Sequence, residues 1–196
     1  MRSPLGWFAA TVVGYALGMG LSVALVGAIA RPLSPVLDGM LYVALFGAIT
    51  GLGVGLAQIF GLPRRAVTPV AWIAASLIGA AAGFALASLV GEILGNVIPY
   101  TAGLIVGGGT IQGITGAMVG LGIGSAQRLV APTLGPRWLL ATVVGVALGY
   151  AAAAGALEFL EVPILRLNLP TSFGAFVGIF AGTAQAIVMR SRTPSA

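Results

Sequence analysis

The stretch GAITGLGVGLAQ at residues 47–58 decides the fold, because it recurs as GAMVGLGIGSAQ at 116–127 and as GAFVGIFAGTAQ at 174–185. All three copies follow the pattern Gly-Ala-x2-Gly-x3-Gly-x-Ala-Gln. Glycines four residues apart lie on one face of a helix and let a neighbouring backbone approach closely. The pattern therefore predicts three helices that pack through small-residue faces. The predicted helix-packing residues are Gly47, Gly51, Gly55, Gly116, Gly120, Gly124, Gly174, Gly178 and Gly182.

A second pattern, Trp-x6-Gly-x3-Gly, precedes each copy of the first and begins at Trp7, Trp72 and Trp138. Tryptophan is enriched where a transmembrane helix meets the membrane–water interface, so we expect these three residues to be interface anchors. Together the two patterns predict an internal repeat of three helical hairpins, at 4–61, 69–128 and 136–190.

The composition predicts an integral membrane protein. Of 196 residues, 59% are hydrophobic and 7% are charged, whereas soluble domains carry about 25% charged residues. Six apolar segments are long enough to cross a bilayer about 30 Å thick. They lie at about 4–29, 38–61, 69–91, 100–128, 136–157 and 171–190. The expected fold is an all-α bundle of six transmembrane helices that forms one membrane domain over 1–196.

The first segment is expected to remain in the membrane as a span. Its apolar run, from Leu5 to Ala30, is longer than the roughly 7–15 residues of a signal-peptide core, and its pattern recurs twice later in the chain. We therefore do not expect cleavage.

The distribution of arginine sets the expected orientation. Seven of the nine arginines fall at the chain ends and in the loops after the second and fourth spans, and all four acids fall on the opposite side. The positive-inside rule then places both termini in the cytoplasm. The basic net charge is explained by these loops, and no nucleic-acid partner is expected. All three hairpins would share one orientation, about an axis along the membrane normal. They could form either a pseudo-threefold ring or a line.

Four glutamines are candidates for a polar cluster. Gln58, Gln127 and Gln185 end the three glycine faces, so a threefold arrangement would bring them together. Such a cluster would serve either as interhelical hydrogen bonding or as a constriction for a solute. Gln112 has no counterpart in the other repeats and is accompanied by Thr110 and Thr115.

The residue types present argue against catalysis. The chain has no Cys, His or Lys, and none of its charged residues falls in the middle of a predicted span. Thiolate, imidazole and Schiff-base chemistry are therefore excluded, as is a proton relay within the membrane. We expect no enzyme activity, no catalytic or metal site and no cofactor. A bound lipid, quinone or carotenoid is compatible with glycine-lined grooves but is not indicated.

The GxxxGxxQ helices, each followed by arginines and a Trp-led helix, resemble a set of uncharacterised bacterial multi-spanning membrane proteins in which such hairpins recur. The resemblance covers nearly the whole chain. It implies the bacterial cytoplasmic (inner) membrane as the location and carries no activity with it.

Two functions fit these observations. The first is a non-enzymatic accessory or scaffold subunit of a larger membrane assembly, which packs through its glycine faces against other membrane subunits and lipids. The alternative is a channel, facilitator or transporter subunit for a small neutral or hydrophobic solute.

Overall fold

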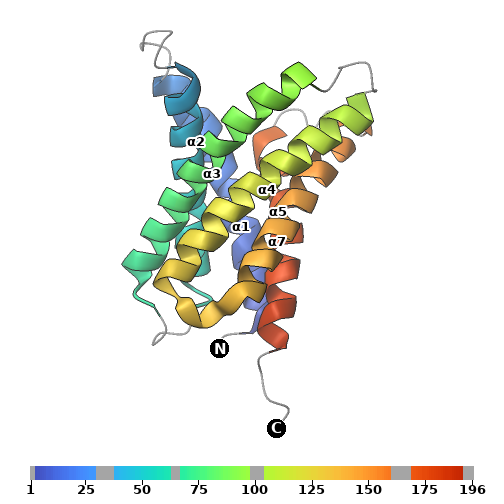
Figure 1. Cartoon of the computed structure of the whole chain (residues 1–196). Coiled ribbons are helices and arrows are strands. Elements are labelled where there is room, and N and C mark those ends of the chain that lie inside the picture. Colours follow the sequence, from blue (N-terminus) through green and yellow to red (C-terminus); the bar gives the residue numbers. More distant parts are fainter. Residues whose placement is uncertain (1–2, 30–37, 63–66, 98–103, 160–168, 192–196) are drawn as a thin grey trace.

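A computed structural model describes residues 3–29, 38–62, 67–97, 104–159 and 169–191, and most of these residues are helical. Six α-helices and one short 3-10 helix occupy these ranges, and no strand is found there (Figure 1). The elements are α1 (Pro4–Ile29), α2 (Asp38–Gln58), α3 (Pro69–Val97), α4 (Leu104–Val130), η2 (Pro132–Leu134), α5 (Gly135–Phe159) and α7 (Leu169–Arg190). The expected all-α fold is confirmed at this level.

Five of the helices, α1, α2, α3, α5 and α7, are long and apolar enough to cross a membrane. The chain thus fits a multi-pass membrane protein. The remaining predicted span, at 100–128, forms α4, a helix of 27 residues, but its described part is not among the five.

The first residues of α1 and α3 show why these helices start where they do. Each begins with a proline, whose fixed φ suits the first turn of a helix. The N–H groups of the first turn have no hydrogen-bond acceptor within the helix, so the N–H that proline lacks costs no hydrogen bond there. The preceding hydroxyl caps the helix: Ser3 Oγ accepts from the Gly6 N–H at 3.1 Å, and Thr68 Oγ1 accepts from the Ala71 N–H at 3.3 Å. At the start of α5, Gly135 has a φ of 66°, which a side chain would disfavour.

Contacts between the helices run in a closed cycle. Each helix packs against the next along the chain, from α1 to α7, and α7 packs against α1. In Figure 1 the start of α1 and the end of α7 lie at the same end of the bundle, which is also where η2 turns between α4 and α5. The first and last described helices are therefore neighbours.

The glycines lie at these helix contacts. Glycines of α1, α3 and α5 meet the helix that follows in the same predicted hairpin; they are Gly14, Gly18, Gly79, Gly83, Gly145 and Gly149. The glycine faces of α2, α4 and α7 instead meet α3, α5 and α1. A Cβ on Gly120 would lie 2.8 Å from the Thr142 carbonyl oxygen, and one on Gly178 would lie 3.0 Å from that of Thr11. The glycine faces are thus occupied within the chain.

Candidate functional site

Three tryptophans from three different helices meet in the interior of the bundle. Trp7, Trp72 and Trp138 lie in the first turns of α1, α3 and α5, and each is at most 1% exposed. Their rings contact one another edge to face, with centroid separations of 5.9 Å, 5.4 Å and 6.2 Å. These positions correct the expectation of interface anchoring, because the indole rings contact one another and not the lipid headgroups.

Each tryptophan donates a hydrogen bond to a buried glutamine. The indole Nε1 of Trp72 donates to Gln58 Oε1 at 3.2 Å, and that of Trp138 donates to Gln127 Oε1 at 3.1 Å. Trp7, in the first helix, donates in the same way to Gln185 Oε1 in the last helix, at 3.0 Å. A buried indole N–H needs an acceptor, and the glutamine amide supplies it.

The glutamine amide nitrogens bind a second set of partners. Gln58 donates to Thr11 Oγ1 at 3.1 Å, Gln127 donates to Ser76 Oγ at 3.0 Å, and Gln185 donates to Thr142 Oγ1 at 3.0 Å. Each glutamine thereby joins two helices, since its oxygen and its nitrogen bind different neighbours.

Direct bonds between glutamines complete the layer. Gln127 Nε2 donates to Gln58 Oε1 at 3.1 Å, and Gln58 Nε2 lies 3.3 Å from Gln185 Oε1. The structure thus brings Gln58, Gln127 and Gln185 together, and each is at most 1% exposed. We call these glutamines, with the three tryptophans and the hydroxyls that bind them, the Trp–Gln layer.

The hydroxyl members of this layer were missed in the sequence. Thr11, Ser76 and Thr142 are fully buried, and each stands four residues after one of the tryptophans. Residues four apart share a helix face, so a hydroxyl recurring at this spacing was a readable signal. It was overlooked because the tryptophans were expected to lie at the membrane–water interface.

The Trp–Gln layer is polar without being charged. Its side chains exchange hydrogen bonds among themselves, which offsets the cost of burying them. An ion would find no opposite charge here, so the layer suits hydrogen bonding with water or a neutral solute.

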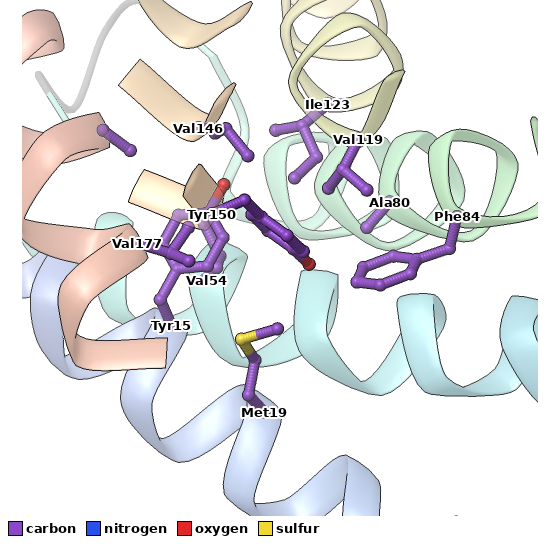
Figure 2. Packing of buried hydrophobic residues seen from close by; sticks show 11 residues of the cluster. Tyr15, Met19, Val54, Ala80, Phe84, Val119, Ile123, Val146, Tyr150 and Val177 are labelled. Atoms are coloured by element: carbon purple, nitrogen blue, oxygen red, sulfur yellow. The ribbon is translucent and has the colours of Figure 1, made fainter. Parts of the chain in front are cut away.

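An apolar cluster occupies the interior beside this layer. It contains residues one and two turns further along the same helices, such as Tyr15 and Met19 on α1 and Val146 and Tyr150 on α5. Figure 2 shows side chains from different helices meeting here, with Tyr150 in their midst. These side chains form a buried apolar core of the bundle.

A cavity of about 310 Å³ lies at the far side of the apolar cluster from the Trp–Gln layer. Its lining includes Gln112 and Thr115 of α4 and Tyr150 of α5. Gln112 is therefore separate from the other three glutamines. Tyr150 is only 3% exposed, yet its hydroxyl has no hydrogen-bond partner among the described residues. A buried hydroxyl left unpaired costs about 1–3 kcal/mol.

Aromatic rings form much of the remaining cavity wall. Phe46 contacts Phe84, Phe84 contacts Tyr150, and Tyr150 contacts Phe173, each edge to face, with centroid separations of 5.2 Å, 6.3 Å and 5.1 Å. These rings come from α2, α3, α5 and α7. The cavity therefore has an aromatic wall and a smaller polar wall on α4 and α5.

Comparison of the chain with protein-family models, curated proteins and solved structures finds no match.

Proposed function

We propose that the chain is a facilitator or transporter subunit for small neutral solutes in the bacterial cytoplasmic membrane. The observation that carries the proposal is the order of three environments through the interior. A cavity whose described lining is uncharged comes first, an apolar cluster follows, and the uncharged Trp–Gln layer comes last. A solute that crosses such a path must shed water without meeting a compensating charge, which favours neutral molecules. In the conformation described, the apolar cluster and the Trp–Gln layer close this path.

The proposed architecture is a pseudo-threefold ring of three parallel hairpins. It is supported by the closed cycle of helix contacts. It is also supported by the Trp–Gln bond, which links neighbouring hairpins in three places at 3.0–3.2 Å. A ring has a central axis, so equivalent side chains from the three hairpins meet on it.

The proposed orientation places the Trp–Gln layer at the cytoplasmic end and the cavity on the opposite side. Among described residues, Arg128, Arg137 and Arg190 lie at the end of the bundle that carries the tryptophans, whereas Glu92 lies near the other end of α3. The positive-inside rule favours the cytoplasm for the arginine-bearing end.

The experiment is solute flux into proteoliposomes. We expect urea or glycerol to enter liposomes containing the protein faster than empty liposomes, as measured by stopped-flow light scattering. Truncation of the tryptophan cluster by Trp72→Ala or Trp138→Ala should widen the closed end and raise the rate further. The control truncation is Leu129→Ala, since Leu129 is 82% exposed. Entry no faster than into empty liposomes, for the wild type and for both widened variants, would refute the facilitator.

An accessory role in a larger membrane assembly is placed second. The glycine faces that favoured it in the sequence pack against helices of the same chain, so a partner subunit would have to bind the outer surface of the bundle. Extraction from native membranes in mild detergent tests this role, which requires a partner protein in fixed stoichiometry.

A further inference from the structure

We propose that the cavity beside Tyr150 is a binding site for a small uncharged ring compound that carries an amide or carbonyl group on one edge. The inference deepens the proposed function, because it names the solute class that the facilitator would take up. Binding at equilibrium does not require transport, so the two proposals can fail separately.

The first argument is the unpaired hydroxyl of Tyr150. Buried polar groups are nearly always hydrogen-bonded, and here a side chain that is 3% exposed lines a cavity with its hydroxyl unpartnered. The other buried tyrosine of the core, Tyr15, does not line the cavity. The hydroxyl oxygen is itself buried, so a ligand that hydrogen-bonds to it would displace the side chains that now cover it.

The second argument is that the polar side chains lining the cavity lie close together. Gln112 precedes Gly116 by four residues and so shares its face of α4, and a Cβ on Gly116 would lie 2.9 Å from Tyr150 Cβ. The amide of Gln112 and the hydroxyl of Tyr150 therefore belong to adjoining walls of α4 and α5. Thr115 adds a third hydrogen-bonding group from the same helix. An amide or carbonyl edge matches these donors and acceptors.

The third argument is the break in the repeat. The positions of the other two repeats that correspond to Gln112 are Val43 and Pro170, and those that correspond to Tyr150 are Met19 and Phe84. Polar side chains thus replace apolar ones in only one third of the predicted ring. Packing of the repeat does not require this change, whereas recognition of an asymmetric ligand does.

The aromatic wall of the cavity indicates the chemical character of the rest of the ligand. Phe46, Phe84 and Phe173 line the cavity, and aromatic rings attract a flat apolar ligand through edge-to-face or stacked contacts. The lining side chains that the structure describes are all uncharged, so they offer an ionised ligand no partner charge. The volume of about 310 Å³ stands at the lower end of the ~300–1,000 Å³ typical of ligand pockets.

The experiment measures benzamide binding to the intact protein in lipid nanodiscs by saturation-transfer NMR, with protein-free nanodiscs subtracted. Benzoate is the matched charged probe. We expect saturable binding of benzamide and none of benzoate. Tyr150→Phe removes one oxygen and keeps the ring contacts, and it should weaken benzamide binding roughly three- to tenfold, the worth of one hydrogen bond. Gln112→Leu should weaken binding by a similar factor. Tyr15→Phe makes the same chemical change outside the cavity and should leave binding unaltered.

Three results would overturn the proposal: no saturable benzamide signal, equal binding of benzoate, or equal affinity in Tyr150→Phe, Gln112→Leu and the wild type. Thermal melting of each variant in the same nanodiscs shows whether it is folded. If Tyr150→Phe is unfolded, Gln112→Leu alone decides the outcome. Benzamide binding without solute flux would refute the facilitator and leave the site standing, and flux without benzamide binding would do the reverse.

Discussion

The indole nitrogen of Trp7, in the first helix of the bundle, donates a hydrogen bond to the amide oxygen of Gln185, in the last helix, at 3.0 Å. The same bond joins Trp72 to Gln58 and Trp138 to Gln127. In those two cases the partners are near in sequence, whereas here the bond joins helices at opposite ends of the chain.

The Trp7–Gln185 bond should matter as much for stability as its counterparts. Trp7→Phe and Trp72→Phe each remove an indole N–H and leave a buried amide oxygen with one donor fewer. Each should lower the free energy of unfolding by about 1–2 kcal/mol, the upper range for an interhelical hydrogen bond in a membrane protein. Thermal melting in one detergent measures both variants. A large loss for one and none for the other would show that the three bonds are not equivalent.

The two kinds of glutamine should respond differently to replacement. Gln127→Leu leaves the Trp138 N–H and the Ser76 hydroxyl without the partners they have now, so we expect a loss of about 1–3 kcal/mol. Gln112→Leu changes a residue that lines the cavity and should leave the melting temperature nearly unchanged. Equal destabilisation by the two substitutions would contradict the separation of the cavity from the Trp–Gln layer.

Replacing glycine by alanine should lower stability where the glycine contacts a neighbouring helix and not where it has no neighbour. A Cβ on Gly120 would lie 2.8 Å from the Thr142 carbonyl oxygen, whereas one on Gly91 would meet nothing within 4 Å. Gly120→Ala should therefore push α4 from α5 and cost about 1–3 kcal/mol, as overpacking does. Gly91→Ala should be neutral or slightly stabilising, because alanine favours the helix. The melting temperatures of the two variants provide the comparison.

Contact between the first and last helices can be tested with a disulfide, since the chain has no cysteine of its own. A Cβ on Gly20 would lie 3.7 Å from Thr171 Cβ, which is within the range that a disulfide spans. The double variant Gly20→Cys/Thr171→Cys should oxidise to an intramolecular cross-link that mass spectrometry of proteolytic fragments detects. A control pair, Gly20→Cys/Gly91→Cys, lies on α1 and α3, which are not neighbours in the contact cycle, and it should remain reduced. An uncrosslinked first pair would exclude the closed cycle.

The elements were largely readable in the sequence, because span length, proline starts and glycine spacing are local properties. The helices begin and end within a few residues of the predicted segments except for α3, which continues to Val97. The predicted span at 100–128 forms the helix α4, Leu104–Val130, and its described part is not among the five helices that are long and apolar enough to cross a membrane.

The directions in which the side chains of the site point could not be predicted from the sequence. A tryptophan in the first turn of a membrane helix faces either the interface or a neighbouring helix, and its position along the chain does not distinguish these cases. Which glutamine each indole meets depends on how separate hairpins pack, which is a long-range property. The cavity beside Tyr150 was missed because it takes side chains from five helices other than α4, and the space between them depends on how those helices pack.

The junction between α7 and α1 has a consequence for the order of the chain. The contacts at this junction resemble those between α2 and α3 and between α4 and α5, and each is made through a glycine face and a Trp–Gln bond. These contacts therefore do not depend on which helix comes first along the polypeptide. A circularly permuted chain that begins at α3 and ends at α2 would make the same contacts.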